Sequence, residues 1–204
     1  MSIGDFFRVK SALWSEQATV IRRYYPKSVR FALADLALGL CSLFFNPYRH
    51  GRKRGEIYGE TPLTTLHRIA DLCHLTASDT WLELGSGRGK SCFWIAQFAG
   101  CRAIGLEKIP LFTHLARFLS SLFQIRADFQ QGDMFEADFS AATCVYVYST
   151  CLSDEQLSRL AQRMTSLPPG ARIVTISAPL PGWPHRPFPI SFPWGQAEAY
   201  LHTK

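Results

Sequence analysis

A glycine-rich turn lies between a short apolar run and a helix-like segment near the middle of the chain. The run covers residues 80–84, the turn has glycine at positions 85, 87 and 89, and the helix-like segment follows at 90–98. Glycine at such positions permits positive φ angles and lets a ligand reach backbone N–H groups without meeting a Cβ. An ordinary strand–helix connection has the same outline, but a strand, a glycine turn and a helix N-terminus in this order also make a nucleotide-ligand site.

The acid inside this motif indicates the kind of ligand. Glu83 stands two residues before the first glycine, so the pattern is E-x-G-x-G-x-G. Dinucleotide-binding enzymes have G-x-G-x-x-G instead, and their pyrophosphate sits at the helix N-terminus, where an acid in the approach to the turn would repel it. A nicotinamide-dependent oxidoreductase is therefore disfavoured. A carboxylate at this position suits a ligand with an ammonium group, and S-adenosylmethionine is such a ligand.

Two further acids stand where an adenosine would need hydrogen-bond acceptors. Glu107 ends a second strand-like run, 101–106, about 20 residues past the glycines, where a carboxylate can accept both ribose hydroxyls. Asp133 follows a third run and could accept the adenine amino group while Met134 or Phe135 packs on the ring. Strand-end acids are common and usually solvated. Together with the glycine turn, these two indicate a cofactor site.

From about residue 56 to the C-terminus, the chain resembles a class I S-adenosylmethionine-dependent methyltransferase. Three motifs narrow the resemblance: Tyr-Gly-Glu-Thr at 58–61 ahead of a helix, the glycine turn, and Gly-Leu-Glu-Lys at 105–108 at a strand end. In this order they are similar to the non-SET histone lysine methyltransferase family. The related ATP synthase subunit and adenine nucleotide translocase lysine methyltransferases have a similar order of motifs.

The resemblance implies S-adenosylmethionine as cofactor and a protein-lysine ε-amine as acceptor, with Glu60 and Thr61 in a loop that closes over the methionine end of the cofactor. Glu83 and the backbone of the glycine turn would hold the methionine moiety. The residues expected to bind the cofactor are Glu60, Thr61, Glu83, Leu84, Gly85, Ser86, Gly87, Gly89, Glu107, Lys108, Gly132, Asp133 and Met134.

The acceptor is expected beside the end of the fourth predicted strand, 143–148. Methyl transfer from a sulfonium to an amine needs mainly positioning and a neutral amine, which a dry aromatic site favours. Tyr148, Ser149 and Thr150 are the residues we expect to line this site in the catalytic role. The chain has Ser-Thr-Cys at 149–151 where the histone enzymes have Asn-Asn-Phe, so this difference concerns the acceptor and not the cofactor.

Four aromatic residues near the C-terminus have two interpretations. They could form the core of edge strands, or an aromatic wall along the methylene chain of the substrate. They are Trp183, Phe188, Phe192 and Trp194.

The order of apolar runs predicts an α/β fold. The resemblance implies a Rossmann-like, seven-stranded, mostly parallel sheet with helices on both faces and an antiparallel last strand. Strands are predicted at 79–84, 101–106, 127–131, 143–148 and 171–177, with a final pair at 188–192 and 196–202. Helices are predicted at 63–72, 90–99, 110–124 and 153–166.

An N-terminal helical extension, 1–55, is expected before the catalytic domain, 56–204. Its segment 29–45 is apolar nearly all round, and basic residues flank it on both sides. Three arrangements are open: a helix buried against the catalytic domain or in a dimer, a helix resting on an anionic membrane surface through residues 29–54, or a transmembrane span. Arg30 and Asp35 lie within this segment, and an acid near mid-span is costly in lipid.

Composition limits the partners. The net charge of +6 over 204 residues is too small for a nucleic-acid signature, and the six cysteines show no metal-binding spacing. We therefore expect no metal, no nucleic-acid partner, and a reducing, cytoplasmic location, peripheral to a membrane if residues 29–54 contact one. The protein substrate is implied by the family resemblance. Two alternatives remain open: a methyltransferase for a small or lipid-like acceptor at a membrane surface, and a non-catalytic scaffold. The intact acids and glycines argue against the scaffold.

Overall fold

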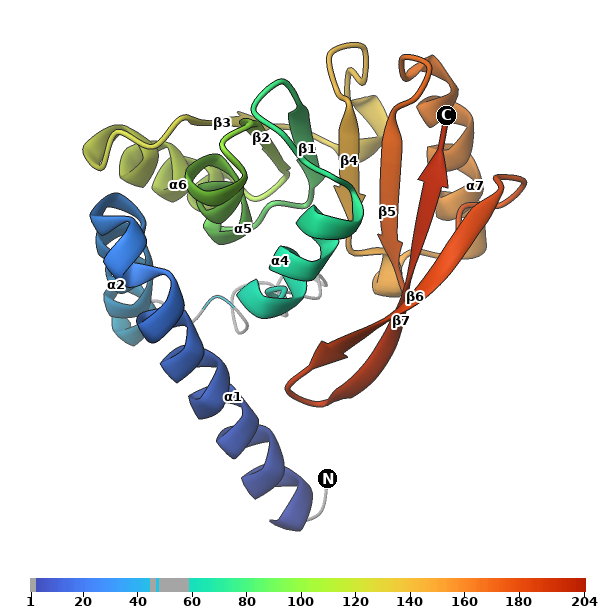
Figure 1. Cartoon of the computed structure of the whole chain (residues 1–204). Coiled ribbons are helices and arrows are strands. Elements are labelled where there is room, and N and C mark those ends of the chain that lie inside the picture. Colours follow the sequence, from blue (N-terminus) through green and yellow to red (C-terminus); the bar gives the residue numbers. More distant parts are fainter. Residues whose placement is uncertain (1–2, 45–46, 48–58) are drawn as a thin grey trace.

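The chain forms one seven-stranded sheet with the order β3-β2-β1-β4-β5-β7-β6 (Figure 1). The computed structural model describes residues 3–44, 47 and 59–204. The strands are β1 Thr80–Leu84, β2 Arg102–Glu107, β3 Ala127–Gln131, β4 Cys144–Val147, β5 Arg172–Ile176, β6 His185–Phe192 and β7 Gly195–Thr203. The first five strands are parallel, and β7 lies antiparallel between β5 and β6. The fold class predicted from the sequence is therefore confirmed.

Helices cover both faces of the sheet (Figure 1). On one face, α4, α5 and α6 share a hydrophobic core with the N-terminal helices, and α7 packs on the other face with the opposite sides of β1, β2, β4 and β5. The helices are α1 Ile3–Arg23, α2 Val29–Phe44, α4 Leu63–Leu72, α5 Lys90–Trp94, α6 Pro110–Leu122 and α7 Asp154–Arg163.

Two predicted helices differ from the structure in their last turns. The helix predicted at 90–99 is α-helical only to Trp94 and continues as a π-helical turn over Ile95–Ala99. The helix predicted at 153–166 is α7 followed by a 3₁₀ turn, Met164–Ser166. The last turn of the first helix is wider than an α-helix, and that of the second is narrower. A pattern of apolar residues at one helical period does not distinguish these turns from an α-helix.

The C-terminal hairpin is longer than predicted despite its prolines. Pro187 and Pro189 lie on β6, which is the edge strand, and their side chains are exposed. Phe188, Ile190 and Phe192 alternate with them and are buried. A proline on an edge strand removes no ladder hydrogen bond if its position faces solvent, so strand β6 tolerates both prolines.

The N-terminal helices pack against the catalytic fold. Phe31 and Leu38 of α2 are buried in the same core as Trp94 of α5. On α1, the Glu16 carboxylate accepts hydrogen bonds from the backbone N–H of Thr64 at 3.1 Å and from its hydroxyl at 2.7 Å, which satisfies the N-terminus of α4. One side of the segment expected at 29–45 is thus buried against the domain.

None of the helices in the described ranges combines the length and the apolarity that a membrane span requires. The transmembrane arrangement of α2 considered above is therefore wrong for the residues described. The domain boundary expected between residues 55 and 56 lies outside the described residues and stays a prediction.

His202 of β7 is a fully buried imidazole whose contacts require the neutral ring. Its Nε2 accepts a hydrogen bond from the backbone N–H of Leu180 at 3.3 Å, and its Nδ1 lies 3.2 Å from the carbonyl oxygen of Pro184. The second contact needs a proton on Nδ1, and the first needs a lone pair on Nε2. Burial lowers the pKa of this imidazole to about 4.

The stability that His202 contributes is expected to fall as pH drops from 6.5 towards 4. The unfolded chain takes up the imidazole proton at the ordinary pKa of 6.5, and the folded chain only near 4, so protons favour unfolding between these values. Urea unfolding of the wild type and of His202→Gln would measure this. The gap in unfolding free energy should shrink by up to about 2 kcal/mol between about pH 7.5 and about pH 5.

The exposed His114→Gln serves as a control that should leave the pH dependence unchanged. An equal gap between the wild type and His202→Gln at both pH values would contradict the prediction.

Candidate active site

A pocket lies at the carboxyl ends of the neighbouring parallel strands β1 and β4. Three segments line it: the stretch ahead of α4, the glycine turn with the first turn of α5, and the end of β4. The lining residues are Gly59, Glu60, Thr61, Glu83, Leu84, Gly85, Ser86, Gly87, Arg88, Lys90, Ser91, Tyr146 and Tyr148. Seven of the residues expected to bind the cofactor are therefore brought together here, with Tyr148 from the expected acceptor site.

Glu83 is a buried carboxylate at the base of this pocket. The Ser91 hydroxyl donates to it at 2.9 Å, and the Cys92 thiol donates at 3.1 Å. Burial raises its pKa to about 7, although these hydrogen bonds act in the opposite direction. Among the described residues, Glu83 has no cation as an ion-pair partner. The site therefore contains a buried acid that a ligand cation could neutralise.

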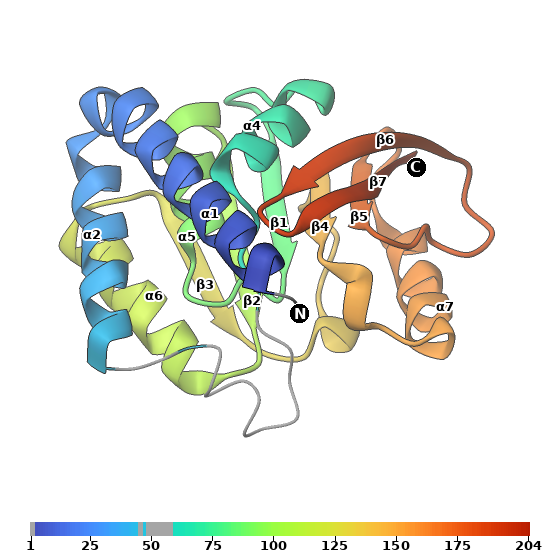
Figure 2. The ribbon, with the colours of Figure 1, turned by 90° about the horizontal axis from the view of Figure 1, so that it is seen from below.

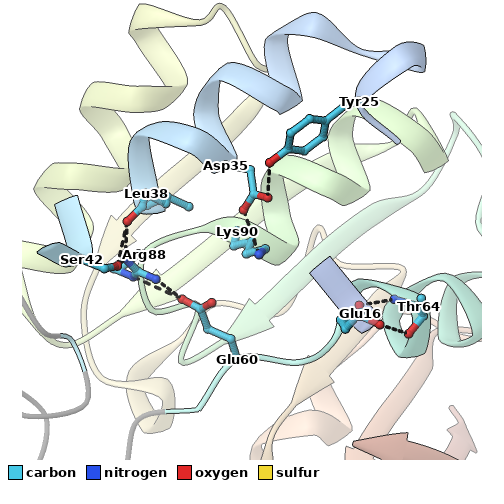
Figure 3. Close-up of polar contacts among 9 residues, drawn as sticks. All are labelled: Glu16, Tyr25, Asp35, Leu38, Ser42, Glu60, Thr64, Arg88 and Lys90. Atoms are coloured by element: carbon cyan, nitrogen blue, oxygen red, sulfur yellow. Dashed lines mark hydrogen bonds and ion pairs between the residues drawn. The ribbon is translucent and has the colours of Figure 1, made fainter. Parts of the chain in front are cut away.

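Arg88, in the glycine turn, joins three segments. It donates to the Glu60 carboxylate from Nη2 at 2.5 Å and from Nε at 3.2 Å (Figure 3). Its Nη1 donates to the carbonyl oxygen of Leu38 at 2.9 Å and to the hydroxyl of Ser42 at 2.7 Å. Because Leu38 and Ser42 belong to α2, the guanidinium holds the N-terminal helix and the Glu60 segment together at the edge of the pocket.

Lys90, at the start of α5, is paired in the same way. Its Nζ lies 2.8 Å from Oδ1 of Asp35, and the Tyr25 hydroxyl donates to Oδ2 of that acid at 3.0 Å (Figure 3). Burial disfavours the ammonium, but the carboxylates of Asp35 and Glu60 outweigh it, and the pKa of Lys90 is raised. Asp35, the acid inside the apolar segment, is therefore explained by its partner at the start of α5.

Glu107 fixes the shape of the turn. Its Oε2 accepts the backbone N–H of Gly87 at 2.8 Å, and its Oε1 accepts that of Ile109 at 2.7 Å. These two bonds hold the carboxylate at the end of β2, beside the glycine turn. Gly89 has φ of +86°, and a Cβ there would lie 2.5 Å from the ring of Phe129, so only glycine fits.

Ser86 supplies a test of whether this pocket fits a polar ligand. Its side chain is buried, and its Oγ has no hydrogen-bond partner among the described residues. A buried hydroxyl without a partner costs free energy, which a polar group of a ligand would recover. Together with Glu83 and the turn's backbone, it makes a donor and acceptor set suited to an amino acid and a ribose.

The segment after β3 was expected to bind adenine. Asp133 is exposed, and its Oδ1 accepts the backbone N–H of Phe135 at 2.9 Å, which caps a short 3₁₀ turn, Met134–Glu136. Met134 Cε lies 3.9 Å from the position that a Cβ on Gly85 would occupy, so this side chain packs beside the glycine turn. Phe135 is buried in the core. Of the two candidates for packing on the ring, Met134 is the better placed.

The remaining expected cofactor residues are more peripheral. Leu84 is a buried core residue of β1, and Lys108 is exposed. Gly132 donates its backbone N–H to the carbonyl oxygen of Glu107 at 3.1 Å. Their roles stay predictions.

The expected acceptor residues separate in the structure. Tyr148 is half-buried in the pocket wall, and its ring meets that of Phe192 edge-to-face, with centroids 5.8 Å apart. The Ser149 hydroxyl is buried and donates to the carbonyl oxygen of Ile176 at 2.5 Å, so it ties β4 to β5. Thr150 is exposed and hydrogen-bonds Ser177. Contact between Ser149 or Thr150 and an acceptor therefore stays a prediction with no support from the pocket lining.

The pocket wall continues outward in aromatic residues. Trp194, at the tip of the β6–β7 hairpin, stacks on Phe192 with centroids 4.6 Å apart and is half exposed. Within the pocket, the hydroxyls of Thr61 and Tyr146 lie 2.5 Å apart and tie the stretch ahead of α4 to β4. Phe188 and Phe192 are buried, in agreement with the interpretation that they form the core of the edge strands. Phe192 also contacts Tyr148, which lines the pocket.

Arg88, Lys90 and Asp35 were not among the residues expected at the site. A basic residue between the glycines, another directly after them, and a lone acid in an apolar helix are the signals that could have indicated an ion-pair network. In the described part of the chain, no group of three or more His, Cys, Asp or Glu residues could hold a metal ion.

Comparisons with known proteins agree with this geometry. The model of one protein family, the ANTKMT methyltransferase domain, matches residues 83–186. A protein-lysine N-methyltransferase from Saccharolobus islandicus is 27% identical over 129 residues, which cover 62% of this chain and 79% of that protein. The H3 lysine-79 specific histone-lysine N-methyltransferase of Dictyostelium discoideum is 24% identical over 142 residues, 62% of this chain but only 8% of its own length.

Solved structures include a similar fold with a ligand. An RNA methyltransferase from Salinibacter ruber, in complex with S-adenosyl-L-homocysteine, has a TM-score of 0.62 and 28% identity. The match covers 71% of this chain and 93% of that one. Its ligand is a suitable probe for the pocket described above.

Affinity for S-adenosylhomocysteine is expected to fall as pH drops below about 7. An ammonium group binds the carboxylate form of Glu83, whose pKa in the free protein is about 7, so at lower pH binding must first expel a proton. Calorimetric titration from about pH 5.5 to about pH 8 should show a loss of up to about tenfold per pH unit. Glu83→Gln should bind weakly at every pH, and the exposed Glu155→Gln should behave as wild type. A pH-independent affinity would rule out this role of Glu83.

Asp35→Asn is expected to destabilise the protein and weaken binding of S-adenosylhomocysteine. The change leaves the Lys90 ammonium buried without its partner, which typically costs about 3 kcal/mol, and adds an uncompensated cation beside the pocket. Chemical unfolding and calorimetry would measure both effects. The control is Asp128→Asn, whose pair with Arg102 is about 60% exposed on both sides and should cost less than about 1 kcal/mol. Equal effects of the two variants would contradict the prediction.

Proposed function

Since this chain belongs to the family of ANTKMT methyltransferase domains and is an S-adenosylmethionine-dependent methyltransferase, we propose that it methylates the ε-amine of a lysine in a protein. The observation that carries the proposal is the buried Glu83 carboxylate, which lines a pocket beside an aromatic wall and has no protein cation as partner in the described chain. The Saccharolobus relative, named as a protein-lysine N-methyltransferase, supports lysine as the acceptor.

We propose that the protein binds the cofactor through three groups of residues. Glu83 and the N–H groups of the glycine turn would hold the amino acid end, with the free Ser86 hydroxyl as a further polar contact. Glu107 would accept the ribose hydroxyls, and Asp133 and Met134 would hold adenine. Glu60 and Thr61 would cover the amino acid end. When bound, S-adenosylmethionine supplies a methyl group that is activated by its sulfonium.

The protein's contribution to transfer would be orientation and exclusion of water. A lysine amine must lose its proton before its lone pair can attack, and a dry aromatic environment lowers the pKa of an amine. Tyr148 and Phe192 supply such an environment beside the pocket. Burial raises the pKa of the Tyr148 phenol, so it stays neutral and would orient the amine through its hydroxyl rather than remove a proton.

We also propose that the protein works in the reducing environment of the cytoplasm. All six cysteines are free thiols, in agreement with the reducing, cytoplasmic location expected from the sequence. The curated relatives differ greatly in length, and the matched region is a small part of the Dictyostelium protein, so its target is not transferred to this chain.

The acceptor class can be tested with radiolabelled S-adenosylmethionine and a cell extract. Acid hydrolysis of labelled protein should release methylated lysine. Tyr148→Ala should reduce labelling at least about tenfold while S-adenosylhomocysteine still binds, because its expected contact is with the amine. Tyr200→Ala, which removes a partly exposed tyrosine of β7, is the matched control and should keep full labelling.

Two results would overturn the lysine proposal. One is label that partitions with RNA or with lipid while protein stays unlabelled, which would make a nucleic-acid or lipid-like acceptor the substrate. The other is cofactor binding with no labelling of any fraction, as a non-catalytic scaffold would give.

A further inference from the structure

Helices α2 and α6 lie side by side (Figure 2). Both have large apolar side chains that are exposed to solvent. We call this the α2–α6 surface and define it by Leu36, Leu40, Leu43 and Phe44 of α2 with Phe118 and Leu122 of α6. Each of these six side chains is exposed, from 52% for Leu36 to 93% for Phe44. The four on α2 recur at helical spacing on the side opposite Phe31 and Leu38, which are buried in the core. Helix α2 therefore has two apolar faces, one buried and one exposed.

This surface has no negative charge. Across α2 and α6 the sequence contains one acid, Asp35, and that acid is buried and paired with Lys90. Both helices therefore present only apolar, neutral or basic side chains to solvent. An apolar face of this kind on a monomer marks an interaction site, because isolated exposed apolar residues are common but contiguous rows are not.

A shallow hollow with three arginines adjoins one end of the surface. Arg30 at the start of α2 donates to the carbonyl oxygen of Gln124, just past α6, at 3.1 Å, which joins the two helices. Arg117 and Arg126 line the same hollow. The one acid in its lining, Asp128, pairs with Arg102 at 3.1 Å. The hollow is therefore net positive, next to an apolar row.

We propose that the α2–α6 surface rests on an anionic phospholipid membrane, with the apolar row among the acyl chains and the arginine hollow at the lipid phosphates. An amphipathic face bound in the plane of a membrane combines these two features: apolar area for insertion and cations for the anionic headgroups. No helix in the described part of the chain could span the bilayer, in keeping with binding in the plane. A second copy of the chain would present the same face, whose one acid, Asp128, already pairs with Arg102, so it offers no further counter-charge for the arginines.

The orientation leaves the active site accessible from solution. The pocket is formed by the glycine turn and the end of β4, and the face of α2 that reaches it through Leu38, Ser42 and Asp35 is opposite the apolar row. Membrane binding and methyl transfer therefore use different sides of the same helix.

Flotation of the full-length protein with vesicles tests this inference. The probes are vesicles of phosphatidylcholine alone and vesicles with about one third phosphatidylglycerol. We expect binding to the anionic vesicles that weakens with salt, because the arginine contribution is screened. Leu36→Gln with Leu40→Gln, and separately Arg30→Gln with Arg126→Gln, should each reduce the partition coefficient at least about tenfold.

Matched controls are Trp14→Gln on α1 for the loss of an exposed apolar residue, and Arg159→Gln on α7 for the loss of an exposed cation. Calorimetry with S-adenosylhomocysteine verifies that each variant is folded, since none of these residues lines the pocket. Binding that is equal for neutral and anionic vesicles, absent from both, or unchanged in the α2 double variant would overturn the proposal. So would a wild-type dimer that Leu36→Gln with Leu40→Gln converts to monomer, because a second copy would then cover the surface.

Discussion

Two ion pairs at the glycine turn, Arg88 with Glu60 and Lys90 with Asp35 of α2, are the interactions on which the pocket depends. Arg88 in the turn and Lys90 at the start of α5 are cations that would otherwise repel a cationic ligand, and they are neutralised by Glu60 and by Asp35 respectively. Glu83 is left as an acid with no cation partner within the described chain. A buried pair adds little net stability on average, but it fixes geometry, because removing one partner leaves a costly charge. Here that geometry selects the charge of the ligand.

The contacts of Arg88 and Lys90 join the N-terminal helices to the lining of the pocket. Glu16 of α1 caps α4, whose preceding residues include Glu60 and Thr61, and α2 holds Arg88 and Lys90. A division of the chain into an extension and a catalytic domain follows the sequence pattern. In energetic terms, the N-terminal helices supply one of the two counter-charges, Asp35, and two hydrogen-bond acceptors for Arg88, so the two segments are packed as one unit.

Local patterns were enough to predict the first five strands, their parallel orientation, and the glycine turn, because apolar runs and glycine spacing depend on neighbours in sequence. The final antiparallel pair was expected from the family resemblance. Local patterns were not enough for Arg88, Lys90 and Asp35, since the partners are 28 to 55 residues apart. Nor did they show that the Ser149 hydroxyl turns towards the carbonyl of Ile176 and not towards the pocket. The direction in which a side chain at a strand end points depends on which backbone groups of the adjacent strand lack hydrogen-bond partners. The spacing of residues in the sequence does not show which groups these are.

The position of β7 in the sheet has a consequence for synthesis of the chain. Strand β5 pairs with β4 on one side, but its other edge pairs with residues 195–203, which are made about 20 residues after β5 is complete. Until they arrive, an apolar parallel sheet has an open edge with unpaired N–H and C=O groups, the kind of edge that pairs with other chains. The hairpin is therefore also the element that ends the period in which a nascent chain is most exposed to aggregation.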